Sequence, residues 1–104
     1  MTRVRLSREA AAELEEAARW YELQSPGLGG KLLNAVEQTL DLLQGATPPL
    51  LPVPGPAGAR GAKRMILRRF PFSIVIVERN GEHIVVAFAH HARRPGYWRD
   101  RLGE

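Results

Sequence analysis

The sequence predicts an α+β fold that consists of a short N-terminal strand, a helical hairpin, a three-stranded, mostly antiparallel sheet and a short C-terminal tail. The first observation is a 3.6-residue spacing of apolar residues in residues 8–43. The second is a set of β-branched, alternating runs in residues 62–89, and the third is Asn80-Gly81 between two of those runs. The expected order is therefore β-α-α-β-β-β, and we expect residues 1–104 to form a single domain.

The first 21 residues predict a strand followed by a helix. Residues 2–6 alternate polar and apolar side chains, which is typical of a strand. Ser7 offers a hydroxyl as N-cap, and Glu9 would lie in the first turn, where the helix dipole favours an anion. The helix would present one apolar stripe of mostly small residues, which allow close packing: Ala10, Leu14, Ala17, Ala18 and Tyr21.

A second helix is predicted directly after Ser25-Pro26-Gly27, because Pro26 disfavours helical geometry at the preceding residue. Gly45 is expected to end this helix. Its apolar face would contain Leu28, Leu32, Leu33, Val36, Leu40 and Leu43. Trp20 and Tyr21, at the end of the first helix, are expected to pack the hairpin against the sheet.

The second half begins with a proline-rich connector, residues 46–59, in which we expect no regular element. Strands are then predicted over residues 62–69, 72–78 and 83–89, and the first has Met65 and Leu67 on one face and Arg64, Ile66 and Arg68 on the other. Asn80-Gly81 predicts a type I′ turn between the last two strands. The final segment, residues 93–101, is short, basic and aromatic, and is expected to form a turn or one to two helical turns.

Charge is distributed unevenly along the chain. Residues 1–59 hold five Lys/Arg and seven Asp/Glu, a balance of −2, whereas residues 60–104 hold ten and four, a balance of +6. This asymmetry favours a polyanionic partner for the second half, although a merely solubilising basic surface is the alternative. The chain has no cysteine, which excludes disulfides and thiolate zinc sites. The N-terminus lacks the apolar run of a signal peptide, and no segment is long enough to span a membrane, so we expect a soluble cytoplasmic protein that does not bind membranes.

Four sequence blocks, in this order along the chain, resemble the RelE/ParE toxins, which are also known as plasmid stabilisation proteins. They are Trp20-Tyr21-Glu22, Pro26-Gly27-Leu28-Gly29, Arg69-Phe70-Pro71-Phe72, and a closing pattern of His90, His91, Arg93, Pro95, Tyr97, Trp98 and Arg101. Together they cover nearly the whole chain except the connector.

The resemblance implies the toxin component of a type II toxin–antitoxin system. It further implies a heteromeric complex with a cognate antitoxin, whose disordered segment folds on binding and which alone contacts operator DNA. The family contains two activities: ParE-like members poison DNA gyrase without being enzymes, and RelE-like members cleave ribosome-bound mRNA. A third alternative is a degenerate toxin that only pairs with its antitoxin.

Candidate residues follow from these two activities. A nuclease needs a base, an acid and a cation to stabilise phosphate charge. Only in that case would the catalytic residues be Arg64, His91, Arg93 and Tyr97. The candidates for target or nucleic-acid binding are Arg64, Arg68, Arg69, Arg93, Arg94, Trp98, Arg99 and Arg101. Ile66 and Ser73 stand where the resemblance to the nucleases implies further cations, so inhibition of gyrase is favoured over RNA cleavage.

Two pairs of residues leave alternatives open. His90 and His91 are adjacent on a strand and should point to opposite faces, so one is expected to be packed and the other to face the basic surface. For the same reason we expect no metal site, and the sequence indicates no cofactor. Tyr97 and Trp98 could stack on bases or anchor a partner, and they could equally cover the end of the sheet.

Overall fold

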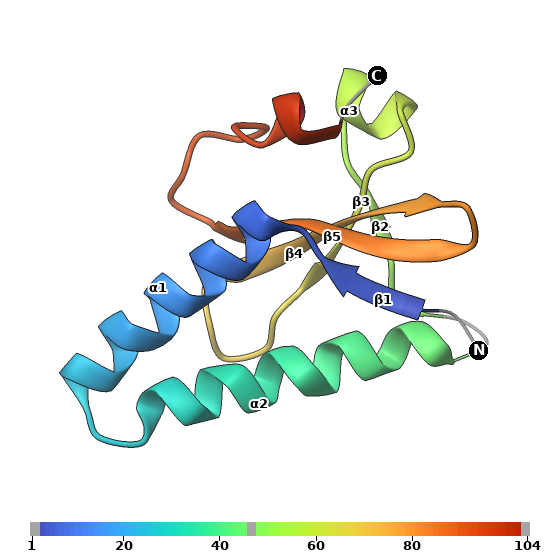
Figure 1. Cartoon of the computed structure of the whole chain (residues 1–104). Helices are drawn as coiled ribbons and strands as arrows, with labels where there is room; N and C mark the ends of the chain where they lie inside the picture. Colours follow the sequence, from blue (N-terminus) through green and yellow to red (C-terminus); the bar gives the residue numbers. More distant parts are fainter. Residues whose placement is uncertain (1–2, 46–47, 103–104) are drawn as a thin grey trace.

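A computed structural model describes residues 3–45 and 48–102, and it shows an α+β fold (Figure 1). The elements are β1 (Arg3–Leu6), α1 (Arg8–Gln24), α2 (Leu28–Asp41), η1 (Leu42–Gln44), β2 (Leu51–Pro52), α3 (Pro56–Ala59), β3 (Lys63–Ile66), β4 (Phe72–Arg79), β5 (Glu82–His90) and η2 (Arg99–Leu102). Among these residues, no helix has the length and apolar content that a membrane span needs. The predicted strand, helical hairpin and closing hairpin are all present.

The sheet is larger than predicted, because it has five strands in the order β1-β5-β4-β3-β2. β1 pairs with β5 in parallel, and the other neighbours are antiparallel. The three predicted strands of the second half, β3, β4 and β5, form its centre. β1, the N-terminal strand, forms one edge of the sheet, and β2, a two-residue strand of the connector, forms the other.

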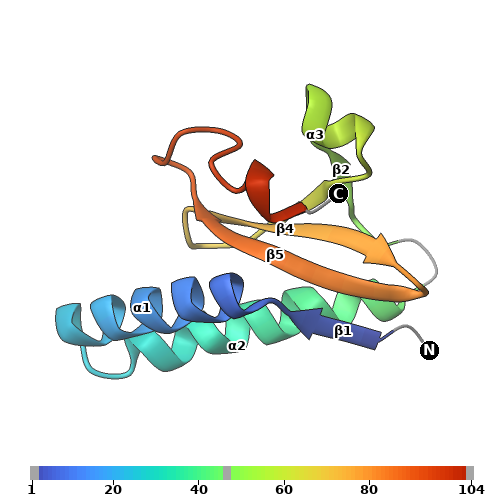
Figure 2. The ribbon, with the colours of Figure 1, turned by 45° about the horizontal axis from the view of Figure 1, so that its top comes forward.

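Both faces of the sheet are covered. Figure 2 shows α1 and α2 against one face, and α3 with the C-terminal segment on the other. The helix-side core consists of Ala10, Leu32, Val36, Leu43, Met65, Leu67, Phe72, Ile74, Ile76, Val85 and Phe88. The tail-side core consists of Ala57, Ala62, Val75, Val77, Val86, Ala87, Trp98 and Leu102. Because β4 lies between two cores, its first six residues are all buried, which explains its almost continuous apolar sequence.

Hydrogen bonds fix both ends of α1 in the helical hairpin, and the first of them is the N-cap that the sequence predicts. The Ser7 hydroxyl accepts a hydrogen bond from the Ala10 N–H at 3.1 Å and caps α1. At the other end, Glu22 accepts hydrogen bonds from the N–H groups of Gly27 and Gly29. A Cβ at Gly29 would lie 2.6 Å from the carbonyl oxygen of Ala18, so glycine there permits the close approach of the two helices.

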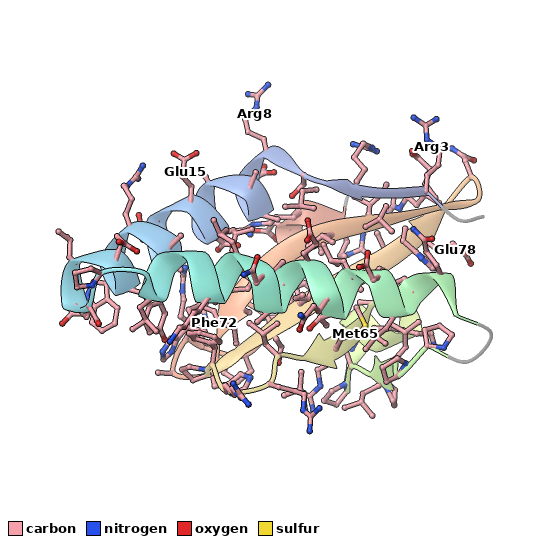
Figure 3. All side chains as sticks on the ribbon, turned by 90° about the horizontal axis from the view of Figure 1, so that it is seen from below. Arg3, Arg8, Glu15, Met65, Phe72 and Glu78 are labelled. Atoms are coloured by element: carbon pink, nitrogen blue, oxygen red, sulfur yellow. The ribbon has the colours of Figure 1, made fainter. Side chains whose placement is uncertain are left out.

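Two apolar residues expected in the core are exposed. Trp20 is 56% exposed, and its ring lies edge-on against Tyr21 at 5.0 Å, so it does not pack the hairpin against the sheet. Tyr21 alone does so, through edge contacts with Phe70 and Phe72. Leu33 is 45% exposed, because it lines an open groove between α1, α2 and β1 and is not part of the core. Figure 3 shows Met65 and Phe72 beside α2, on the buried side.

The proline-rich connector contains two short elements, contrary to the prediction of none. Leu51 and Pro52 form β2, which pairs with β3 at the edge of the sheet, where a proline without an N–H is tolerated. Pro56 opens the single-turn helix α3, a position in which proline suits helical geometry. Ala57 of this turn is buried in the tail-side core, so the connector covers one end of the sheet.

The β4–β5 hairpin carries the predicted turn and one irregularity. Asn80 and Gly81 have φ values of 52° and 77°, and a type I′ turn requires positive φ at both positions. Further along, Val75 pairs with Ala87 but Ile76 pairs with Val85, so Val86 is an extra residue in β5. This bulge places both Val86 and Ala87 in the tail-side core.

Candidate functional site

A groove of about 550 Å³ lies on the tail side of the sheet. Its floor is formed by β3, β4 and β5, and its walls by residues 53–57 of the connector and by the tail, which we define as residues 91–102. The polar and charged side chains that line it are Arg64, Ser73, His90, His91, Arg93, Arg94, Tyr97 and Arg99. No carboxylate is among the lining residues, so the groove is cationic.

The groove brings together most of the residues that the sequence singled out. All four candidates for a nuclease line it: Arg64, His91, Arg93 and Tyr97. Arg94, Trp98 and Arg99 of the proposed binding set line it as well. Arg68 and Arg69 are exposed in the turn between β3 and β4, outside the groove, and Arg69 has a positive φ of 72° there. Arg101 is also outside the groove.

Arg64 enters the groove from β3. It is partly buried, and its Nε is a buried donor without a hydrogen-bond partner among the described residues. Ile66, two residues along the same strand, also lines the groove and is half exposed. A guanidinium with an unused donor beside an apolar wall can donate a hydrogen bond to an anionic or carbonyl oxygen of a bound partner.

The two histidines have different surroundings, as strand alternation predicts. The His91 ring lies in the groove, with Nε2 3.0 Å from the hydroxyl oxygen of Ser73. The His90 ring instead lies edge-on against Phe72 at 5.0 Å, and its Nδ1 accepts a hydrogen bond from the Ala92 N–H. His90 is thus the packed histidine and His91 the more exposed one, and both residues line the groove.

Trp98 is only 4% exposed, because its indole is part of the tail-side core. It therefore covers one end of the sheet, the second of the two alternatives that the sequence left open. Tyr97, next to it, is partly buried and forms a wall of the groove. The Arg93 guanidinium lies 3.8 Å from the centre of the Tyr97 ring, a cation–π contact.

The charged end of the tail is held by Glu13 of α1. The Tyr97 hydroxyl donates to Glu13 Oε2 at 2.6 Å, and Arg101 donates to Oε1 at 2.9 Å and to Oε2 at 3.1 Å. The Phe88 N–H of β5 donates to Oε1 at 3.0 Å, and Arg93 Nη1 lies 3.5 Å from Oε2. The carboxylate is 16% exposed, so these contacts form largely out of water.

This network shifts the ionisation of its members. Burial raises the pKa of Glu13, but the hydrogen bonds from Arg101, Tyr97 and the Phe88 amide outweigh burial and keep the pKa below its ordinary value. Burial, and then the hydrogen bond to Glu13, raise the pKa of Tyr97 to about 12. The hydrogen bond to Glu13 also raises the pKa of Arg101. At neutral pH Glu13 is therefore an anion and Tyr97 a neutral hydrogen-bond donor.

Glu13 is the residue of this network that the sequence reasoning missed. A signal for it exists, because Glu13 stands three residues after Ala10 and four before Ala17, within the apolar stripe of α1. A carboxylate on the buried face of a helix needs a partner, and the basic C-terminal segment is the richest source of donors. Ser73 was considered only as a departure from the nucleases, and its bond to His91 was not foreseen.

Residues 4–95 match the family model described as "ParE toxin of type II toxin-antitoxin system, parDE". The chain is also similar to a solved structure from P. aeruginosa, titled "Chromosomal ParDE TA system". The two share 25% sequence identity and superpose with a TM-score of 0.70, over 86% of this chain and 96% of the other. No curated protein matches the chain significantly.

Proposed function

The chain belongs to the ParE toxin family of type II toxin–antitoxin systems, and on this premise we propose that it inhibits DNA gyrase in the cytoplasm when it is free of a cognate antitoxin. The action is binding rather than catalysis. The cationic groove and the tail form the surface that contacts the target. Arg94 and Arg99 are exposed there, and Arg64 contributes an unused donor.

The observation that carries this proposal is the hydrogen bond from Tyr97 to Glu13. A nuclease of this family needs a group that gives a proton to the leaving oxygen. The Tyr97 proton points to a carboxylate instead, and with a pKa of about 12 this phenol is a weak acid at neutral pH. Arg93 and Arg64 remain charged and cannot exchange protons readily. Imidazole is the side chain best suited to proton exchange, and His90 and His91 are the lining residues that carry one.

We also propose that the partner of the toxin is a cognate antitoxin, as the ParDE title of the similar structure implies for that protein. A second groove, of about 510 Å³, lies between α1, α2 and β1, away from the cationic groove. Its apolar lining residues are Leu6, Ala11, Leu14, Ala18, Gly29, Gly30 and Leu33. Such a surface fits the apolar face of an amphipathic antitoxin helix, and operator DNA would then be bound through the antitoxin.

The alternative function is RelE-like cleavage of ribosome-bound mRNA. One observation favours it: Arg64, His91, Arg93 and Tyr97 all line the same groove. His91 could serve as the base and the guanidinium groups could stabilise the phosphorane charge. The acid would have to be supplied by a group other than Tyr97.

Induction in cells without the antitoxin distinguishes these functions. Inhibition of gyrase predicts double-strand breaks and a DNA-damage response, while messages stay intact. RNA cleavage predicts new mRNA ends within reading frames and rapid loss of translation. Normal growth at confirmed expression of folded protein would contradict both, and would indicate a chain that only pairs with its antitoxin.

A further inference from the structure

We propose that Glu13 is a positioning residue for the target-binding surface, because its carboxylate holds Arg93 and Tyr97 in place at the wall of the cationic groove. This inference rests on the proposed function, since binding to a target is what requires a fixed tail.

Glu13 lies where three parts of the chain meet. β1 pairs with β5 only as far as Val85, whose carbonyl accepts the Ser7 N–H. In the part of the chain that the structure describes, the outer edge of β5 has no strand neighbour after that point. Glu13 and Arg101 satisfy this open edge: Oε1 accepts the Phe88 N–H, and Arg101 Nη1 donates to the Val86 carbonyl at 3.2 Å. The carboxylate is thereby fixed to the sheet as well as to its own helix.

From this fixed point Glu13 contacts three side chains of the tail. Arg101, 21% exposed, has both terminal nitrogens on the carboxylate, so its charge is neutralised. Arg93 is 54% exposed, and one of its nitrogens approaches Glu13 while its plane stacks on Tyr97. Glu13 and Tyr97 therefore hold one side of the Arg93 guanidinium, and its remaining donors face solvent and the groove.

The fold of the tail does not depend on these polar contacts alone. Trp98 and Leu102 are buried in the tail-side core, and the Leu102 carbonyl accepts a hydrogen bond from Arg79. Without the Glu13 charge, the backbone of the tail would keep these anchors. Arg93 and Arg101, however, would be two like charges around one ring with no anion between them, and repulsion would separate them.

Glu13→Gln tests the inference, with Glu15→Gln as the matched control. Both changes remove one charge from α1, but Glu15 is exposed, lies outside the cationic groove and pairs only with Arg19 among the ion pairs of the described residues (Figure 3). Glu15 lines the second groove, so Glu15→Gln is the control for inhibition of gyrase and for thermal unfolding, and not for antitoxin affinity. Gyrase supercoiling is measured against toxin concentration, together with thermal unfolding and affinity for the antitoxin. We expect Glu13→Gln to weaken inhibition about tenfold, while Glu15→Gln stays within about twofold of the parent.

The ionisation of Tyr97, followed by absorbance, reports directly on its contact with Glu13. Loss of the Glu13 charge and hydrogen bond lowers the pKa of Tyr97, so its phenol ionises at lower pH in Glu13→Gln than in the parent. Absorbance after a rapid pH jump records this before the protein unfolds. Tyr21 is the other tyrosine of the chain, and a Tyr97→Phe variant gives its contribution separately.

The outcomes separate this inference from the proposed function. Equal inhibition by Glu13→Gln and Glu15→Gln, or an unchanged Tyr97 ionisation, would overturn the positioning role. So would a parallel loss of inhibition, antitoxin affinity and thermal stability, because Glu13 would then only support the fold. If Glu13→Gln does not fold, Glu13→Asp keeps the charge at shorter reach and must still weaken inhibition. A parent chain that leaves gyrase active refutes the proposed function instead, and the Tyr97 ionisation still tests the contact.

Discussion

Glu13 and Arg101, which are 88 residues apart, form a two-point ion pair in which Nη1 and Nη2 of the arginine lie 2.9 Å and 3.1 Å from the two carboxylate oxygens. This pair joins the first helix to the last turn of the chain across the open edge of β5. The pair neutralises the charge of Arg101, which the sequence predicts to be part of the basic binding surface. Arg101 therefore belongs to the support of the groove, and Arg94 and Arg99 belong to its lining.

The ion pair predicts an acid-sensitive fold. The pKa of Glu13 is lower in the folded protein than its ordinary value of 4.5, so the unfolded chain binds the proton more tightly. The contribution of Glu13 to stability is complete above that ordinary value and is lost as the pH falls through the folded pKa. Thermal unfolding of the parent should therefore lose more stability between about pH 6 and about pH 3 than that of Glu13→Gln. Parallel pH profiles for the two proteins would contradict this.

The two tryptophans should differ in their importance for stability. Trp98 is buried and Trp20 is 56% exposed. Trp98→Ala should cost about 3–5 kcal/mol of unfolding free energy through the cavity it leaves. Trp20→Ala should cost no more than about 1.5 kcal/mol, because it loses little beyond the edge contact with Tyr21. Chemical denaturation followed by far-UV circular dichroism measures both, and equal costs would refute the placement of these rings.

Adjacent glycines of α2 offer a test of helix packing. A Cβ at Gly29 would lie 2.6 Å from the Ala18 carbonyl oxygen, whereas a Cβ at Gly30 meets nothing within 4 Å. Gly29→Ala should destabilise the protein by about 1–3 kcal/mol through overpacking. Gly30→Ala should stabilise it by about 0.5–1 kcal/mol, since alanine favours the helix. A stabilising Gly29→Ala, measured by thermal unfolding, would contradict the close approach of α1 and α2.

Removing the charge of Arg94 tests whether the cationic groove binds the target, and removing the charge of Arg8 is the control. Both side chains are exposed, but Arg94 lines the groove and Arg8 projects from α1 away from the rest of the molecule (Figure 3). Arg94→Gln should weaken inhibition of gyrase by about tenfold at low salt, and the difference should shrink as salt screens the charge. Arg8→Gln removes the same charge and should have little effect. Equal losses in the two variants would mean that only net charge matters.

Local sequence signals were sufficient for much of this fold. Ser7, the Pro26 break and Asn80-Gly81 each act on neighbouring backbone, and all three predictions are confirmed. The small strand β2 and the turn α3 were missed, because proline density argues against regular structure while single positions at an edge or a first turn still accept proline.

The remaining errors concern contacts between distant segments. Helical periodicity assigns Leu33 to an apolar face, and the size of Trp20 favours packing, but neither signal shows which part of a helix the sheet covers, and both side chains are exposed. The same reason explains why Glu13 was missed: its partners are Phe88, Tyr97 and Arg101, which only the folded topology brings to α1. For the site, the sequence named most of the polar and charged residues that line the groove but not what orients them.

Purified gyrase, treated with the purified chain before and after addition of the antitoxin, tests the central proposal most directly. The account predicts that the free toxin blocks supercoiling and traps cleaved DNA, that the antitoxin restores supercoiling, and that mRNA in a translating extract stays intact. Full supercoiling activity at saturating toxin, together with new ends in translated messages, would contradict it.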